Sequence, residues 1–247
     1  MRVTFMTSSR SRDLDTAVYQ RDGYILLGKS LEDACVQQLI TEEKRFRKRD
    51  HRLVVLTQLM HRSALIREVA TQGVHIAALR QLMGNNICLT HQQYVSKSRH
   101  PDTPEIDVPW HQDNGYGRLD PMTDITVWFA LDDCDERTGC LWVVPGSHRW
   151  PLAEHTDMHG LRGMSVDQPG VALPMRAGEA VAFSGLLVHC SKAHRGPHTR
   201  HAFYLRYCEP HVRMLRRPGA ESCTESGMQD GKPVLEDGHS WMVSGEA

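Results

Sequence analysis

The spacing of apolar residues divides the chain into two parts, with the change about a third of the way along. In the segment 63–83 apolar residues recur at helical spacing, and Gly73 interrupts them where a helix would break. The segment 30–47 has the pattern of a charged amphipathic helix, while the short apolar run 24–27 is typical of a strand. The N-terminal part, about 10–84, is therefore predicted to be helical with one strand.

Beyond Gly84 the pattern becomes a series of short β-rich segments separated by proline, glycine, aspartate and asparagine. Many short strands at modest spacing are typical of a β-sandwich or jelly roll. We therefore predict a mainly β fold with flanking helices. The predicted strand segments are 86–96, 108–113, 124–132, 139–145, 171–175, 180–190 and 200–209.

The segment 125–131 has the clearest strand pattern. Successive side chains of a strand point to opposite faces, so one face of this segment is apolar and the other is mixed. We expect the apolar face to lie against helices and the mixed face against a cavity. The apolar face carries Ile125, Val127, Phe129 and Leu131, and the mixed face carries Thr126, Trp128 and Ala130.

The composition is that of an ordinary globular protein, since 40% of the 247 residues are hydrophobic and 24% are charged. This length suits one domain with decorations, which we assign to 1–247 with a β core over about 85–210. The last segment, about 216–247, is rich in Gly, Ser, Glu and Asp. It is predicted to be either a loosely ordered extension or a loop that folds over a site.

Charge and cysteine usage exclude several classes of partner. The 29 Lys and Arg residues balance 30 Asp and Glu residues, so no nucleic-acid partner is expected. The seven cysteines are scattered and never form a C-x-x-C pair, which favours reduced thiols and a cytoplasmic location. The polar N-terminus lacks a secretory signal and no later window suits a membrane span, so no membrane partner is expected.

Three residues form a candidate metal site. His111 and Asp113 are two residues apart in a predicted strand, so both side chains are expected to point to the same side. His189 ends the apolar run 181–188 and supplies a third ligand from a second strand. Two histidines and one carboxylate with the remaining positions open are typical of non-haem iron(II) oxygenases, whereas structural zinc takes four closed ligands.

Arg200 is a candidate anchor for an anionic co-substrate. It lies eleven residues after His189, at the start of a predicted strand. A planar and permanently charged guanidinium binds both oxygens of a carboxylate, such as the distal carboxylate of 2-oxoglutarate. Ser191 is expected to point the same way as His189 and to add a hydroxyl group.

In their order and spacing, these residues resemble the phytanoyl-CoA dioxygenase family of iron and 2-oxoglutarate oxygenases. The likeness spans about 20–209 and includes the opening segment 21–27. The matching segments are Trp110-His-Gln-Asp-Asn-Gly-Tyr-Gly117, Val127-Trp-Phe-Ala-Leu-Asp-Asp133, Thr138-Gly-Cys-Leu-Trp-Val-Val-Pro-Gly-Ser-His148, His189-Cys-Ser191 and Arg200.

The resemblance implies a double-stranded β-helix, which is a cupin-like jelly roll, with Fe(II) held by the three candidate ligands. It implies that Arg200 and Ser191 hold 2-oxoglutarate, that Trp128 lines the same pocket and that Gln93 lies near the co-substrate. It also implies oxidation of a small-molecule substrate by O2 at an unactivated C–H, with release of succinate and CO2. Related halogenases replace the carboxylate ligand by a small residue, so Asp113 favours hydroxylation or a related oxidation.

Three further residues are candidates for substrate contact. If Arg200 faces the barrel interior, the period of two also directs Arg206 inward, toward either an anionic substrate or a buried acid. Asn114 and Tyr116 directly follow the metal motif and are expected near the substrate, although Asn-Gly is also ordinary turn chemistry.

Two other functions stay open from the sequence. One is a cupin-like metal-dependent isomerase or hydrolase, against which the spacing of Arg200 argues. The other is a catalytically silent family member that acts as a binding module, which a missing ligand or a blocked pocket would favour. The sequence identifies neither the substrate nor an oligomeric state.

Overall fold

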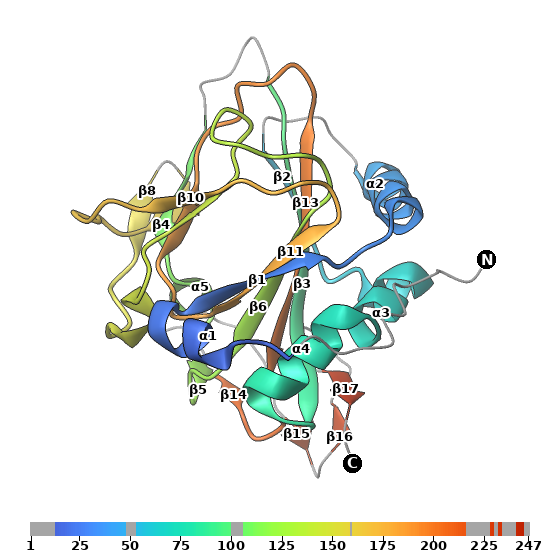
Figure 1. The fold of residues 1–247 in the computed structure, drawn as a ribbon, viewed down its shortest axis with the longest axis vertical. Coiled ribbons are helices and arrows are strands. Elements are labelled where there is room, and N and C mark those ends of the chain that lie inside the picture. The colour runs from blue at the N-terminus through green and yellow to red at the C-terminus, as the bar shows by residue number, and fades with distance from the viewer. Residues whose placement is uncertain are drawn as a thin grey trace.

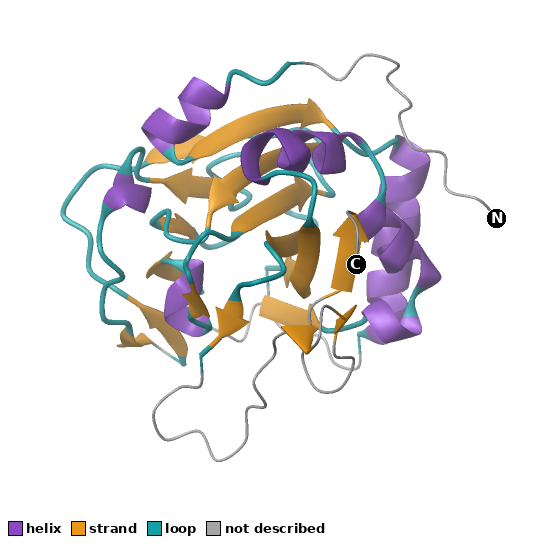
Figure 2. Ribbon diagram, turned by 90° about the horizontal axis from the view of Figure 1, so that it is seen from below, coloured by secondary structure: helices purple, strands orange, loops and turns teal. Residues whose placement is uncertain are grey.

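The computed structural model describes residues 13–47, 53–99, 106–158 and 160–215, together with the backbone of 228–229, 232–233 and 241–244. Two main sheets form the body of the molecule, and helices cover the outer face of the larger one (Figure 1). The view from below shows the helices outside the strands (Figure 2). This is the predicted mainly β fold with flanking helices, arranged as a double-stranded β-helix.

The larger sheet has seven strands, all paired antiparallel. Its order is β1-β11-β6-β13-β3-β17, and β2 also pairs with β3, so neighbours in the sheet come from distant parts of the chain. The strands are β1 (Tyr24–Lys29), β2 (Leu53–Thr57), β3 (Ile87–Lys97), β6 (Ile125–Ala130), β11 (Glu179–Ser184), β13 (Arg200–Cys208) and β17 (Trp241–Ser244).

The smaller sheet has four strands in the order β10-β7-β12-β4. Its strands are β4 (Val108–His111), β7 (Leu141–Val143), β10 (Val171–Leu173) and β12 (His189–Ser191). Three two-stranded pairs lie outside both sheets: β5 (Leu119–Asp120) with β14 (Arg213–Met214), β8 (Thr156–Met158) with β9 (Leu161–Gly163), and β15 (Met228–Gln229) with β16 (Lys232–Pro233).

Helices form in both segments, 30–47 and 63–83, where the sequence pattern predicted them. The hydroxyl of Ser63 caps the helix that follows it by accepting a hydrogen bond from Ile66 N at 2.9 Å. Gly73 has a φ of 106° between two helices, a conformation that favours glycine. The helices are α1 (Thr16–Asp22), α2 (Asp33–Phe46), α3 (Ala64–Thr71), α4 (Val74–Met83) and α5 (Asp113–Tyr116), with 3-10 turns η1 (Met60–Arg62) and η2 (Ser147–Arg149). Across the described ranges, every helix falls short of the length and apolarity that crossing a bilayer requires.

The main core lies between the helices and the larger sheet. Leu39 of α2, Ile66 of α3 and Leu79 of α4 are buried in one cluster with Val127 and Phe129 of β6. The predicted apolar face of β6 therefore lies against the helices, as expected. The other face of the strand is directed into the space between the two sheets.

Two predicted strand segments end differently in the structure. The segment 180–190 is two strands, because the chain turns after Ser184, where Leu187 N donates to Ser184 O at 2.8 Å. The segment 108–113 ends as a strand at His111, and Asp113 begins α5. The two turns meet, since Asn114 N donates to Gly185 O at 3.2 Å. The periodicity of a single strand does not report such a contact between distant turns.

The structure describes only part of the C-terminal segment. Residues 241–244 form β17 and pair antiparallel with β3 at one edge of the larger sheet. In these four residues the predicted extension is an ordered strand of the sheet. Most of the predicted polar extension, 216–227, 230–231, 234–240 and 245–247, lies outside the described residues.

Candidate active site

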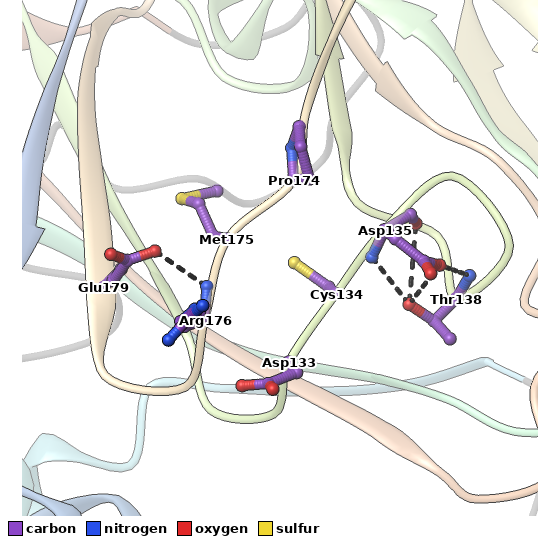
Figure 3. A pocket seen from close by; sticks show the side chains of 8 residues that line it. All are labelled: Asp133, Cys134, Asp135, Thr138, Pro174, Met175, Arg176 and Glu179. Carbon is purple, nitrogen blue, oxygen red and sulfur yellow. Dashed lines mark hydrogen bonds between the residues drawn. The ribbon is translucent and has the colours of Figure 1, made fainter.

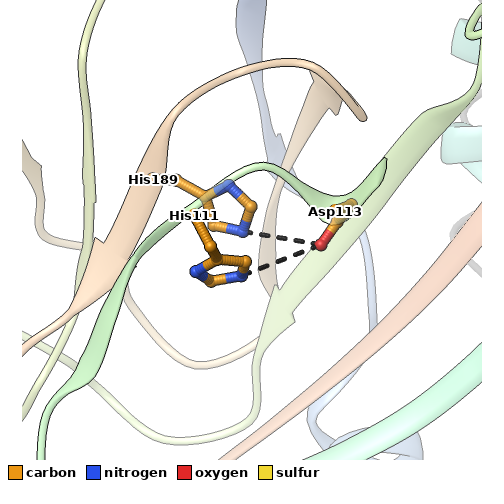
Figure 4. A group of neighbouring side chains, drawn as sticks. All are labelled: His111, Asp113 and His189. Atoms are coloured by element: carbon orange, nitrogen blue, oxygen red, sulfur yellow. Dashed lines mark ion pairs between the residues drawn. The ribbon is translucent and has the colours of Figure 1, made fainter. Parts of the chain in front are cut away.

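The three predicted metal ligands lie together between the sheets. His111 ends β4 and His189 begins β12, and the two are directly opposite each other in the smaller sheet. Their Nε2 atoms lie 3.9 Å and 3.7 Å from Oδ1 of Asp113 (Figure 4). One ligand atom from each residue lies within 4.8 Å of the other two. This spacing suits a single ion in the centre.

Backbone carbonyls fix the orientation of both imidazoles. His111 Nδ1 is 2.8 Å from Pro109 O and His189 Nδ1 is 2.9 Å from Leu187 O. Because a carbonyl only accepts, each Nδ1 carries the proton and each Nε2 presents a lone pair. Burial, reinforced by the proximity of His189, lowers the pKa of His111 to about 3, which keeps that ring neutral.

The carboxylate of Asp113 is held by one hydroxyl group. Thr126 Oγ1 donates to Asp113 Oδ2 at 2.6 Å, which leaves Oδ1 directed at the two histidines. Burial by itself raises the pKa of Asp113, but the neighbouring His189 and Arg206 outweigh it, so the net pKa is lowered. Asp113 therefore stays ionised and offers one oxygen as a ligand.

The donor set fits a catalytic divalent metal. Two neutral imidazoles and one carboxylate fill three positions and leave the others open, as in non-haem iron(II) sites. A structural zinc site would need a fourth closing ligand. Across the ranges that the structure describes, the three residues form the one such cluster of His, Cys, Asp and Glu.

Thr126→Val is expected to weaken iron(II) binding by about 10–100-fold, the usual effect of removing a partner of a metal ligand. Valine keeps the shape of threonine but leaves Asp113 Oδ2 without its donor. Equilibrium competition with a coloured chelator measures the affinity, and Thr126→Ser, which keeps the hydroxyl, is the matched control. Equal affinities for the valine and serine variants would contradict this role.

A cavity of about 530 Å³ opens beside the metal ligands. Its lining combines residues of the larger sheet, such as Trp128 and Arg200, with His189 and Leu141 of the smaller sheet. The candidate residues of the sequence analysis that line it are His111, Asp113, His189, Gln93, Trp128, Ser191, Arg200, Tyr116 and Arg206. The structure thus brings all but one of them into one space.

Arg200 is a buried cation without a carboxylate partner among the described residues. It is 2% exposed, its Nε has no hydrogen-bond partner, and its guanidinium lies 5.7 Å from the centre of the Trp128 ring. Burying an unpaired charge is costly, and burial lowers the pKa of Arg200. The cavity beside it therefore offers a place for an anion.

Arg206 contacts a buried acid, one of its two predicted partners. Its Nε donates to Asp124 Oδ2 at 2.6 Å and its Nη1 donates to Gly117 O at 3.0 Å. Asp124 is fully buried, and it also accepts from the amide of Asn114 at 2.8 Å. The pair ties β13 to the turn that carries Asp113.

Asn114 and Tyr116 occupy different places. The Asn114 amide donates to Asp124 and its oxygen accepts from Leu119 N at 2.9 Å, so the side chain lies outside the cavity lining. The structure thus gives Asn114 a bracing position in place of the expected substrate contact. Tyr116 does line the cavity, with its ring 5.1 Å from that of His111 and its hydroxyl donating to Arg162 O at 2.6 Å.

Arg206→Met is expected to lower the free energy of unfolding by about 3–5 kcal/mol, because it leaves the buried Asp124 carboxylate without its cation. Urea denaturation measures the change. Arg176→Met, which removes an exposed arginine, is the control and is expected to stay within about 0.5 kcal/mol of the parent. A loss under about 1 kcal/mol for Arg206→Met would contradict the structural role of this pair.

Residues of the loop 151–155 brace the motif, and the sequence pattern did not predict them. His155 Nε2 accepts from Gln112 N at 2.9 Å. The Gln112 side chain accepts from Ala153 N at 2.9 Å and donates to Leu186 O at 3.0 Å. Gln112 therefore links the segments that carry the two histidine ligands. Its position inside the motif was the only available signal, because its partners are 39 or more residues away.

A second hollow of about 540 Å³ shares no lining residue with the first (Figure 3). Its polar groups largely bond to one another, since Thr138 Oγ1 bonds to Asp135 and Arg176 N donates to Glu179 Oε2 at 2.7 Å. Cys134 is buried, and burial raises the pKa of its thiol. Nothing in this hollow matches the convergence of groups at the metal ligands.

Known proteins resemble this chain in sequence. The family model for phytanoyl-CoA dioxygenase (PhyH) matches residues 19–202. Phytanoyl-CoA dioxygenase of Arabidopsis thaliana is 36% identical over 111 residues, which are 42% of this chain and 39% of that protein. The peroxisomal phytanoyl-CoA dioxygenase of Rattus norvegicus is 31% identical over 135 residues, 50% of this chain and 40% of that protein. The chain thus spans about two fifths of the length of these curated relatives.

Solved structures share the fold. The epimerase SnoN, in complex with Fe³⁺, alpha ketoglutarate and nogalamycin RO, has a TM-score of 0.72 at 21% identity, over 87% of this chain and 94% of that chain. The carbocyclase SnoK from nogalamycin biosynthesis has a TM-score of 0.71 at 20% identity, over 94% and 98%. HygX from Streptomyces hygroscopicus, with nickel and 2-oxoglutarate bound, has a TM-score of 0.62 at 15% identity, over 78% and 85%.

Proposed function

The chain belongs to the phytanoyl-CoA dioxygenase family, and from this premise we propose that it is an Fe(II)- and 2-oxoglutarate-dependent dioxygenase. His111, Asp113 and His189 would hold the iron. One observation carries the proposal: an open three-ligand site and a buried arginine, which pairs with no carboxylate of the described residues, line the same cavity. The metal would bind one end of a 2-oxo diacid, and the arginine would bind the other end.

We assign four residues to the co-substrate. Arg200 would bind the distal carboxylate through two charge-assisted hydrogen bonds. Ser191, Trp128 and Gln93 line the cavity with it, and the Trp128 ring centre lies 5.7 Å from the guanidinium carbon. These assignments rest on their shared lining of the cavity and on the family resemblance.

Bound iron and 2-oxoglutarate would supply the activation of dioxygen for oxidation of a substrate C–H, with succinate and CO2 as the other products. The protein's own groups position the reactants. The carbonyls of Pro109 and Leu187 hold the imidazoles in the required tautomer, and Thr126 keeps one oxygen of Asp113 directed at the site. Burial of these groups in the barrel excludes water.

We propose a small molecule as the substrate and hydroxylation, or a related oxidation, as the reaction. The cavity has the size of pockets that enclose drug-sized ligands, roughly 300–1,000 Å³. Leu53, Val55, Leu161 and Met214 give part of its lining an apolar character. SnoN is solved in complex with nogalamycin RO and HygX with hygromycin B bound, which supports a small-molecule substrate.

The two other functions have less support. A cupin-like isomerase or hydrolase would have no use for a buried arginine beside the metal that pairs with no carboxylate in the part of the chain described. A silent binding module would be favoured by a lost ligand or a filled pocket, whereas all three ligands are together and the cavity is open.

Anaerobic titration with Fe(II) and then 2-oxoglutarate tests the proposal, with a weak visible charge-transfer band as the expected result. No band, together with no succinate formed in air, would contradict it. A substrate screen that follows succinate release then identifies the molecule that is oxidised. We also propose a cytoplasmic location, which the six free cysteines of the described residues support. Cell fractionation checks it.

A further inference from the structure

Lys97 is a fully buried lysine on the inner face of the larger sheet. It is 1% exposed and lies directly opposite Arg200 in the pairing of β3 with β13. His91, Gln93 and Val95 precede it at a period of two and all line the cavity. Lys97 therefore continues this row at the end of the cavity where Arg200 lies.

The ammonium group of Lys97 crosses from one sheet to the other. Its Nζ donates to Ser191 O at 2.6 Å and to Lys192 O at 2.8 Å. Ser191 belongs to β12, the strand of the smaller sheet that begins with the metal ligand His189. Lys97 thus connects the strand pair that carries Arg200 to the strand that carries His189 and Ser191.

The surroundings of this link are closely packed. Gly139 has a φ of +78°, and a Cβ added there would lie 2.7 Å from Lys192 O and 3.7 Å from Arg200 Nη2. A side chain at this position would therefore collide with the linked carbonyl, while its distance to the guanidinium would be an ordinary contact. The Lys192 carbonyl, the Lys97 ammonium and the Arg200 guanidinium form one compact group.

The charges of this group also indicate an anionic ligand. Within the described ranges, no carboxylate forms an ion pair with Lys97 or Arg200, although both are buried side by side. Burial, followed by the charge of Arg200, holds the pKa of Lys97 well below its usual range. A carboxylate bound at Arg200 would favour the charged form of Lys97.

We propose that Lys97 is a positioning residue that fixes the distance between the metal ligands and the Arg200 anchor, and so selects 2-oxo dicarboxylic acids by chain length. The inference rests on the proposed function. A five-carbon 2-oxo diacid must reach the metal with one end and Arg200 with the other. In a rigid barrel whose two sheets are linked beside the anchor, one methylene more or less misplaces an end by about 1 Å, which is enough for a large loss.

Calorimetric titration of the nickel-loaded protein, which binds without turnover, tests this inference. The probes are oxaloacetate, 2-oxoglutarate and 2-oxoadipate, which differ by one methylene each. The parent protein is expected to prefer 2-oxoglutarate by about 10–200-fold, the discrimination that one methylene usually gives. Lys97→Met, which has a similar length but no donor, is expected to bring the three affinities within about threefold of one another.

The possible results separate the inferences. If Lys97→Met weakens all three acids by the same factor and keeps the preference, Lys97 contributes charge alone, and the positioning role is wrong. If the variant binds all three as the parent does, Lys97 has no role in the site, while the proposed function stands. A parent protein that binds none of the acids overturns both proposals.

Two controls test whether the substitution at Lys97 damages the protein in general. Nickel affinity without any acid is expected to be the same for Lys97→Met and the parent, because Lys97 touches no metal ligand. A variant that lost nickel binding as well would show general damage and contradict a specific role in spacing. If Lys97→Met does not melt cooperatively, Lys97→Gln, which keeps an N–H donor on a shorter stem, is measured with the same expected loss of length preference.

Discussion

Replacing His111 by alanine is expected to abolish tight iron(II) binding and, with it, succinate formation from 2-oxoglutarate. The imidazole supplies one of three protein ligands, and its Nε2 is held at the site by the Nδ1 bond to Pro109 O. Loss of a partner of a ligand usually lowers metal affinity by about 10–100-fold. Loss of the ligand itself is expected to exceed that range and to reduce turnover to the level of metal-free protein.

Metal content after desalting, chelator competition and succinate release together measure the effect of His111→Ala. His211→Ala is the matched control, because His211 is exposed and lies outside the cavity lining. The control is expected to retain both iron and turnover. Parental iron affinity in His111→Ala would show that His111 is not a ligand and would remove the basis of the proposed function.

Replacing Arg200 by methionine is expected to weaken 2-oxoglutarate binding by at least about 100-fold while leaving iron binding intact. Each hydrogen bond to a charged group contributes about 1.5–3 kcal/mol, and 1.4 kcal/mol is a factor of ten. Loss of two such bonds is therefore enough to weaken 2-oxoglutarate binding by about 100-fold. Titration of the nickel-loaded variant measures it, and normal 2-oxoglutarate affinity would show that the anchor lies elsewhere.

The same substitution is expected to leave the free energy of unfolding unchanged or to raise it. An increase would be roughly 1 kcal/mol or more. Arg200 is buried without a carboxylate partner in the described part of the chain, so methionine removes an uncompensated charge. Arg206→Met, six positions along the same strand, is expected to destabilise because Arg206 neutralises Asp124. Opposite signs for the two variants would separate the binding arginine from the structural one, whereas a large destabilisation by Arg200→Met would contradict this distinction.

Alternation along single strands was readable from the sequence. The period of two correctly placed the apolar face of 125–131 against the helices and directed Arg200 and Arg206 inward. The same rule failed at 108–113, since Asp113 begins a short helix. The carboxylate of Asp113 still lies beside the two histidine ligands, because Thr126 of β6 holds it in place.

The roles of neighbouring residues depended on partners far away in the chain. Asn114 was expected near the substrate, but Asp124 and Leu119 occupy its amide. Lys97 carried no signal in the sequence, because its partners, Ser191 O and Lys192 O, are 94 and 95 residues away. Hydrogen bonds between segments so far apart produce no periodic pattern in the sequence.

The sequence by itself predicted which groups would carry the proposed chemistry: His111, Asp113 and His189, which the structure brings together, and Arg200 as the proposed anchor. Ligand type and strand alternation are local properties, so the order of residues is enough to identify them. The tertiary structure alone decided how these groups are held. The packing of the two sheets brings Thr126 into contact with Asp113, Asp124 into contact with Arg206, and Lys97 into contact with β12. These hydrogen bonds exist only when distant strands are packed together.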